Sequence, residues 1–241
     1  MTSTRETGTD VTDAKSLQEY VEQILTGPDP APIVQAGHPV LRGIAVPYSG
    51  QLDDGTLADL VELMRRTMRA APGVGLAAPQ IGIPLALAVL EDPGALDPSL
   101  IAIRERAPLE FRVIVNPRYE PVGTERVSFY EGCLSLSGWQ AVVARYRSVR
   151  LTGQDESGRA LDEIVTGWPA RIVQHETDHL GGMLYIDRAE LRSLAADEGV
   201  GAALGSQPTP AMAARVLGFD LAQATQAARP PSSEQPSSLR R

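Results

Sequence analysis

Residues 168–180 have the sequence WPARIVQHETDHL, and this stretch decides the fold because it has the start and stop signals of a helix. A glycine precedes it, a proline lies in its first turn and two glycines follow it, which is the usual asymmetry of helix ends. His175 and His179 are four residues apart, so both imidazoles project from one face of such a helix. The stretch therefore predicts a helix that carries a pair of histidines.

The segments before this helix are mostly β-type. Runs of branched and aromatic residues, separated by Gly, Ser and Asp turns, predict strands within 85–90, 111–116, 127–130, 140–151 and 160–166. Two earlier segments, 16–25 and 56–70, have apolar residues at helical spacing, and Asp53 and Asp54 are placed to cap the second. The order of elements predicts an α+β fold: antiparallel β-sheets packed around a late metal-binding helix, with an N-terminal amphipathic helix.

Length and composition suit one ordinary domain with extensions. The chain has 241 residues, of which 43% are hydrophobic, and this is enough for a proper core. We expect a disordered N-terminal extension over 1–15, a catalytic domain over 16–190, a C-terminal helical extension over 191–227 and a disordered tail over 228–241. The tail is expected because its composition is rich in Pro and Ser.

Charge and cysteine content exclude several classes of protein. A net charge of −8 argues against direct nucleic-acid binding and against anionic membranes, and no apolar run approaches the ~20 residues of a spanning helix. A single cysteine excludes an intramolecular disulfide framework. The first fifteen residues have neither the apolar stretch of a secretory signal nor the acid-poor composition of a transit peptide. We therefore expect a cytoplasmic protein, and the Arg- and Ala-rich composition suggests a bacterial one.

The histidine pair suggests a metal site. Two neutral imidazoles one helical turn apart can take adjacent corners of a tetrahedral site, and Glu176 can reach a metal-bound water without being a ligand. The alternative is a solvated helix on which two histidines happen to have this spacing. Two of the chain's three histidines lie in this one motif, which favours the metal site.

The residues alone do not decide which side chain is the third metal ligand. Metzincins would have a histidine where this chain has Tyr185, His38 lies far upstream, and Glu198 is an unremarkable candidate for a thermolysin-like ligand. The remaining soft donor is Cys133, which follows a predicted strand in the sequence EGCLS at 131–135. A lone cysteine is more often a small buried apolar residue, so this assignment needs further support.

A glycine-containing segment precedes the first predicted strand. Residues 73–80 have the sequence GVGLAAPQ, in which two glycines let the backbone pass close to a ligand and Gln80 offers an amide donor for an oxyanion. The alternative is an ordinary turn at the end of the preceding helix. The Lys-Ser/Thr ending of a phosphate-binding loop is missing.

Together, GVGLAAPQ at 73–80, EGCLS at 131–135 and QHETDHLGG at 174–182 resemble, in order and approximate spacing, the three motifs of the peptide deformylases. The resemblance covers roughly residues 30–190. It implies removal of the formyl group from the N-formylmethionine of nascent bacterial polypeptides, with release of formate.

The resemblance also implies roles for individual residues. Cys133, His175 and His179 would be the metal ligands, with a water in the fourth place, and Glu176 would be the general base. The formyl oxygen would be held by the side chain of Gln80 and the backbone N–H of Leu134, and the substrate backbone would bind at Gly75. The methionine side chain would lie near the residues that flank these motifs: Val74, Arg171 and Ile172.

Further expectations concern the metal and partners. The family is known for Fe2+ as its working metal, one per chain, with Ni2+ or Co2+ as active replacements and Zn2+ usually poorer; the ligand set alone is compatible with zinc. The substrates would be N-formylmethionyl peptides, and a transient contact with the ribosome is a further expectation. Glu131, Asp178 and Gln174 are candidates to orient the histidines, and Arg145 is a candidate partner for one of the acids.

Two positions depart from the common family pattern. Ser137 stands where a proline is frequent, and Gln140 stands where many members have an arginine, so the preference beyond methionine is open.

Two other functions remain as alternatives. The first is a zinc endopeptidase of the His-Glu-x-x-His type, which would need a ligand other than Cys133. The second is a non-catalytic binding protein stabilised by a metal, in which Glu176 would have no role.

Overall fold

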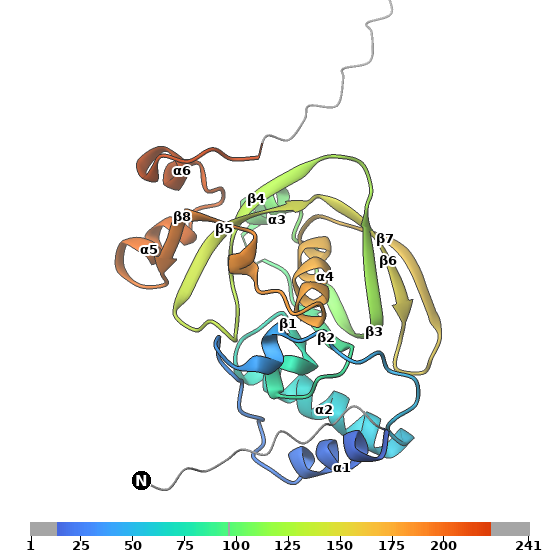
Figure 1. Ribbon diagram of the computed structural model, residues 1–241. Coiled ribbons are helices and arrows are strands. Elements are labelled where there is room, and N and C mark those ends of the chain that lie inside the picture. Colours follow the sequence, from blue (N-terminus) through green and yellow to red (C-terminus); the bar gives the residue numbers. More distant parts are fainter. Residues whose placement is uncertain (1–13, 96, 223–241) are drawn as a thin grey trace, which may run out of the picture.

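Two antiparallel sheets enclose one buried helix, α4 (Gly167–Leu180), in the computed structural model of the chain (Figure 1). The structure describes residues 14–95 and 97–222. Its helices are α1 (Ala14–Leu25), α2 (Asp54–Ala70), α3 (Pro98–Arg104), α4, α5 (Gly199–Gly205) and α6 (Ala211–Leu217), with short 3-10 helices at Pro39–Arg42, Ala78–Ile81 and Tyr185–Asp187. Its strands are β1 (Gly75–Ala77), β2 (Leu87–Asp92), β3 (Leu109–Pro121), β4 (Arg126–Gly132), β5 (Trp139–Tyr146), β6 (Ser148–Gln154), β7 (Ala160–Thr166) and β8 (Ala189–Ala196).

The larger sheet has the strand order β1-β2-β3-β6-β7, and apolar side chains cover both faces of β1, β2 and β3. Successive side chains of a strand point to opposite faces. In β2, Leu87 and Val89 pack with α1 and α2, whereas Ala88 and Leu90 pack with α4. This continuous apolar run explains why the sequence predicts a strand here without alternating polarity.

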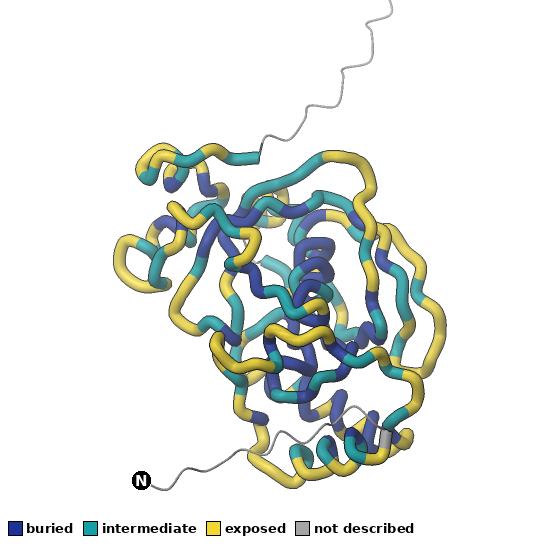
Figure 2. Tube along the Cα trace, viewed as in Figure 1, coloured by how far each residue is buried: buried dark blue, intermediate teal, exposed yellow. Residues whose placement is uncertain are grey.

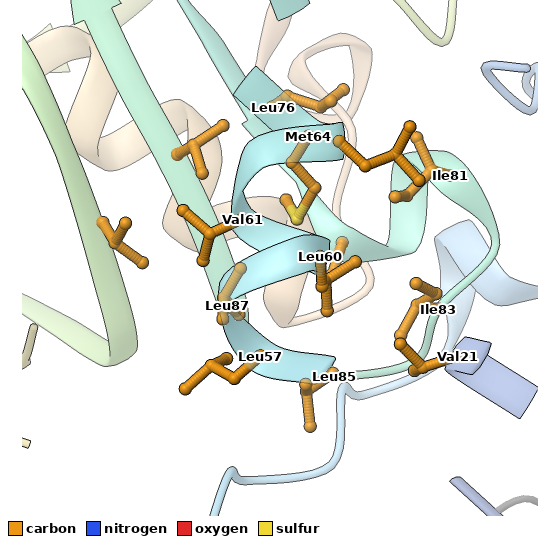
Figure 3. Packing of buried hydrophobic residues seen from close by; sticks show 14 of the residues in the cluster. Val21, Leu57, Leu60, Val61, Met64, Leu76, Ile81, Ile83, Leu85 and Leu87 are labelled. Carbon is orange, nitrogen blue, oxygen red and sulfur yellow. The ribbon is translucent and has the colours of Figure 1, made fainter. Parts of the chain in front are cut away.

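Helix α2 supplies many of the side chains of the apolar cluster between α1, α2 and the larger sheet. Leu57, Leu60, Val61 and Met64 all point from α2 into the cluster shown in Figure 3, toward β1, β2 and α1. The helix begins where the sequence predicts, because the Asp53 carboxylate accepts a hydrogen bond from the Thr56 N–H at 2.8 Å.

Replacing Met64 with Ala is expected to lower the free energy of unfolding by about 2–5 kcal/mol, because the side chain is fully buried and its loss leaves a cavity. Chemical denaturation measures this change. The matched control is Met212→Ala on α6, where the side chain is half-exposed and the change should be small. Equal denaturation midpoints for the two variants would contradict this description of the core.

Helix α4 is buried along most of its length (Figure 2). It starts at Gly167, whose φ of +70° is easy only for glycine, and a Cβ there would lie 2.6 Å from the Glu105 carbonyl oxygen. The N–H of Trp168 donates to that same carbonyl oxygen at 3.2 Å. The position of the histidine pair is therefore fixed by a tight contact at the start of its helix.

The smaller sheet has the strand order β4-β5-β8 and covers α4 from the other side. The run predicted at 140–151 is two strands, since the chain leaves β5 at Tyr146 and enters β6 at Ser148, in the other sheet. Helices α5 and α6 follow β8 and pack on this sheet, where Leu204 and Ala213 form an apolar cluster with Tyr130 and Val142.

The predicted α+β fold, with antiparallel sheets around a late helix, is confirmed. Helix α1 begins at Ala14, within the stretch 1–15 that we expected to be disordered. Strand β8 (Ala189–Ala196) occupies the start of the region 191–227, which we expected to be helical. Residues 1–13 and the tail 228–241 lie outside the described part of the chain. None of the helices within 14–95 and 97–222 is long and apolar enough to cross a membrane.

Candidate metal centre

Three side chains that can bind a metal meet where β4 ends beside α4. Cys133 comes directly after β4, and His175 and His179 lie on α4. One donor atom from each lies within 4.8 Å of the others, and Cys133 Sγ is 3.3 Å from His179 Nε2. The described residues contain no other such group of three His, Cys, Asp or Glu side chains, so Glu198 and His38 do not belong to one.

These donors fit a single divalent ion. Thiolate and imidazole ligands lie about 2.0–2.3 Å from such a metal, so neighbouring ligands of a tetrahedral ion are about 3.3–3.8 Å apart, and the 3.3 Å between Cys133 Sγ and His179 Nε2 matches this spacing. His175 Nδ1 is 3.0 Å from Glu131 Oε2, which leaves Nε2 to face Cys133 and His179. A carboxylate behind a histidine is a common arrangement at metal sites because it fixes the tautomer.

The carboxyl group of Glu176 is buried beside the three donors. Its side chain lines the same pocket, and Oε2 has no hydrogen-bond partner within the described part of the chain. Burial raises the pKa of Glu176 to about 7; the negative Glu131 adds to the increase, whereas His175 and Arg145 oppose it. An unpaired buried carboxyl group that titrates near neutral pH can both accept and donate a proton.

Gly75 allows this carboxyl group to lie where it does. A Cβ at residue 75 would be only 2.3 Å from Glu176 Oε1. The backbone of β1 therefore passes directly over the carboxyl group, and no side chain fits between them.

We expect Gly75→Ala to reduce the rate of the reaction at this site by about 100-fold, because a displacement of roughly 1 Å in a reacting group has that effect. Steady-state kinetics measure the loss, and Gly43→Ala is the control because a Cβ there meets nothing closer than 3.9 Å. Full activity of Gly75→Ala would show that Glu176 need not occupy its observed position.

Gln80 and Leu134 both lie next to Cys133 in the wall of the pocket. Gln80 is buried, and its Oε1 accepts a hydrogen bond from the Ala77 N–H at 2.8 Å. This contact fixes the amide so that its Nε2 faces the site, 3.6 Å from Cys133 Sγ. Leu134 follows Cys133 in the chain and lines the pocket. A fixed amide donor beside the metal ligands can hold a developing oxyanion.

A pocket of about 430 Å³ opens from this site to the surface. It is lined by the substrate-binding candidates of the sequence analysis, Val74, Gly75, Arg171 and Ile172, and by both tryptophans. Val74 and Ile172 also pack into the core between the large sheet and α4, so these two residues belong to both core and pocket wall. The volume suits a ligand the size of a short peptide segment.

Glu131 is the centre of a buried ionic network. It accepts hydrogen bonds from Arg145 Nε and Nη2, both at 2.9 Å, as well as from Arg171 and His175. Arg145 also binds Asp178, so it pairs with both acids that the sequence analysis named. Although burial alone would raise it, the pKa of Glu131 is held well below its usual range by Arg145 and Arg171.

Arg171 and Gln174 make contacts that the sequence analysis did not predict. The guanidinium of Arg171 donates to Glu131 and to the carbonyl oxygens of Val143 and Val127. Its positive charge is therefore paired with a buried carboxylate of the protein. Burial lowers the pKa of Arg171 to about 10, which still leaves it charged at neutral pH. Gln174 does not contact the histidines, because its amide binds the backbone of Tyr146.

Sequence reasoning missed two further residues, one that packs on a histidine of the site and one that lines the pocket. Tyr185 stacks on the His175 ring with centroids 6.2 Å apart, and its hydroxyl donates to the Trp139 carbonyl oxygen at 3.0 Å. Asp197 lines the pocket from the turn after β8. No local motif marks either residue, since both reach the site through long-range packing.

Comparison with known proteins assigns the family. The family model described as polypeptide deformylase matches residues 30–194. Peptide deformylase 3 of Streptomyces avermitilis is 61% identical over 208 residues, which cover 86% of this chain and 92% of that protein. The chain belongs to the peptide deformylase family. A human relative, the mitochondrial peptide deformylase, is 38% identical over 187 residues, covering 74% of this chain and 77% of that protein.

Solved peptide deformylases share this fold. The enzyme of Synechococcus elongatus in complex with actinonin is 31% identical, with a TM-score of 0.57, and covers 80% of this chain and 89% of its own. A class I type b enzyme of Acinetobacter baumannii bound to Met-Ala-Ser is 32% identical, with a TM-score of 0.57, and covers 66% of this chain and 97% of its own.

The family establishes the reaction. Peptide deformylases are metalloenzymes that remove the N-formyl group from nascent polypeptides, and this chain is an enzyme of that family. Nothing in the relatives or in the structural neighbours supports the endopeptidase alternative.

Proposed function

We propose that Cys133, His175 and His179 hold one divalent metal ion in this deformylase, and that Glu176 is its general base. One observation carries the proposal: the three donor atoms lie together beside the pocket that Cys133, His175 and Glu176 line, and a buried carboxyl oxygen of Glu176 has no partner within the described residues. When bound, the metal supplies Lewis acidity, which makes water a stronger nucleophile near neutral pH.

Glu176 would move the proton in this reaction. It accepts a proton from the water that attacks the formyl carbon and then donates a proton to the departing amine nitrogen. The carbon–nitrogen bond breaks, the acid proton of the product passes to the freed amine or to solvent, and formate and the methionine amine leave. A pKa of about 7 supports this role, because the group can then take and return a proton at neutral pH.

The pocket walls would bind the substrate. Gln80 Nε2 and the backbone N–H of Leu134 donate hydrogen bonds to the formyl oxygen, whose negative charge grows during attack. The backbone of Gly75 pairs with the peptide, and the methionine side chain lies against Val74, Ile172 and the stem of Arg171. The apolar contacts of Val74 and Ile172 support this placement.

We further propose Fe2+ as the working metal, one per chain, with Ni2+, Co2+ or Zn2+ as substitutes. A thiolate donates negative charge to the metal, so zinc should acidify water less here than in a three-histidine site. The soft sulfur and two imidazoles are compatible with all four ions.

Formate release from formyl-Met-Ala-Ser tests the proposed function. Protein purified without oxygen should release formate and carry about one metal ion per chain. Removal of the metal with a chelator should abolish release, and each of the four ions should then be added back separately. Release that persists after complete metal removal would overturn the proposed metal site.

We also propose a cytoplasmic location, a transient contact with the ribosome and the division of the chain at about residues 15, 190 and 227. The nascent, formylated substrate supports the first two. The helices α5 and α6, which follow β8, support a separate C-terminal extension.

A further inference from the structure

The segment 33–36 makes contacts at both groups that we propose to hold the formyl oxygen. It has no regular secondary structure. The N–H of Val34 donates to the Gln80 carbonyl oxygen at 2.9 Å. The N–H of Ala36 donates to the carbonyl oxygen of Ser135, the residue after Leu134, at 2.7 Å. One short segment therefore ties together two motifs that are distant in the sequence.

Gln35, which lies between these two residues, binds the turn that carries Leu134. Its Nε2 donates to the Leu134 carbonyl oxygen at 3.0 Å, and its Oε1 accepts a hydrogen bond from the Ser137 N–H at 3.2 Å. The same Nε2 lies 3.3 Å from the carbonyl oxygen of Ile33, in its own segment. An amide side chain offers both a donor and an acceptor, so Gln35 alone holds both ends of the turn 134–137.

Two other hydrogen bonds shape this turn from within. The Leu136 N–H donates to the Cys133 carbonyl oxygen at 2.9 Å, and the Ser137 hydroxyl donates to the Leu134 carbonyl oxygen at 3.2 Å. These bonds do not place the turn relative to Gln80, whereas the contacts from 33–36 do.

The hydrogen bond between Gln35 and Ser137 depends on a departure from the common family pattern. Residue 137 is frequently a proline, and a proline has no N–H to donate. Because this chain has Ser137, the Oε1 of Gln35 finds a donor in the turn.

We propose that Gln35 is a positioning residue for deformylation, which holds the Leu134 peptide so that its N–H and the side chain of Gln80 converge on the formyl oxygen. The inference rests on the proposed function, in which these two groups bind that oxygen. A donor stabilises an oxyanion only when it lies about 2.7–3.1 Å from the place that the oxygen will occupy. Gln35 is not among the residues that line the pocket, so it acts through the turn and not on the substrate.

The test is the kinetics of Gln35→Ala with formyl-Met-Ala-Ser. Its kcat should fall about tenfold, which is less than the roughly 10²- to 10³-fold cost of deleting an oxyanion donor outright. KM should stay close to the parent value, because the oxygen becomes fully charged only in the transition state. Gln35 is exposed, so metal content and the denaturation midpoint should also remain those of the parent. A merely structural contact would not lower kcat alone.

Gln51 is the matched control. Its Oε1 accepts a hydrogen bond from the Ser49 N–H at 2.6 Å, and its Nε2 donates to the Pro47 carbonyl oxygen at 2.8 Å. This amide also spans a turn, but no residue of that turn lines the pocket. Gln51→Ala should therefore leave both kcat and KM unchanged.

A double-mutant cycle tests the route of the effect. Ser137→Pro removes the N–H that Gln35 Oε1 accepts. Gln35→Ala should then lower kcat by a smaller factor in the Ser137→Pro enzyme than in the parent, because the two residues share one contact.

Four results would overturn the inference: the parent kcat in Gln35→Ala, a change confined to KM, an equal loss in Gln51→Ala, or fully additive effects of Gln35→Ala and Ser137→Pro. Failure of the proposed function looks different. Gln80→Leu removes an oxyanion donor directly, and that variant would then keep the parent kcat.

Discussion

Glu176→Gln is expected to lower kcat for formate release by about 10²- to 10⁴-fold, the usual contribution of a positioned proton carrier. Glutamine has nearly the same shape but cannot accept the proton of the attacking water. Because Glu176 is not one of the three donors, the metal content should remain that of the parent. The measurements are formate release and metal content on the same preparation.

Stability provides an independent check on Glu176. Its buried Oε2 has no partner, so the carboxyl group destabilises the fold in its charged form. Glu176→Gln should therefore melt at the same temperature as the parent or at a higher one, the pattern of a residue kept for activity. Glu156→Gln, an exposed site in the β6–β7 turn, is the control and should change neither quantity. A Glu176→Gln enzyme with more than about a tenth of the parent kcat would exclude the general-base role.

Glu131→Gln is expected to have the largest effect on the fold. Arg145 and Arg171 would lose the carboxylate that they share, and one partner lost from a buried ion pair costs about 3–5 kcal/mol. His175 would lose the charged carboxylate that accepts its Nδ1–H, and weakening of such a contact lowers metal affinity by about 10- to 100-fold. Chemical denaturation and metal competition measure the two effects separately.

An exposed pair is the control for Glu131. Asp162 binds Arg150 through two hydrogen bonds of 2.6 Å, but both side chains are half-exposed. Asp162→Asn should keep the denaturation midpoint and the metal affinity close to those of the parent, because solvent screens this pair. If Glu131→Gln and Asp162→Asn have the same midpoint, the buried network does not stabilise this fold.

The sequence predicts the elements whose apolar residues face the core at regular spacing. Helices α1 and α2 are of this kind, whereas α4 is predicted from its start and stop signals and β2 from its continuous apolar run. Strand β8 has the opposite pattern: its buried position is Ser193, whose hydroxyl accepts a hydrogen bond from the Val142 N–H, and Leu191 points outward, two-thirds exposed. Periodicity cannot identify a strand whose polar side chain is inside.

The candidate site divides in the same way. Short sequence motifs predict Cys133, Glu176 and the two histidines, because each of these residues lies in a recognisable stretch. Tyr185 stacks on His175 because its hydroxyl binds the backbone of β5 at Trp139. Asp197 reaches the pocket because β8 pairs with β5 just before it. Neither contact has a local sequence signal, so only the structure reveals them.

The three segments that build the centre also determine when it forms. Gln80, Cys133 and His175 lie far apart along the chain. The strands that lie between them in the sequence, ahead of α4, pair antiparallel with one another. Contacts of such long sequence separation form late in folding. A nascent copy of this enzyme has no complete set of donors until α4 has left the ribosome. Metal capture therefore follows translation of nearly the whole catalytic domain, and the enzyme cannot process formylated chains before its own synthesis is almost finished.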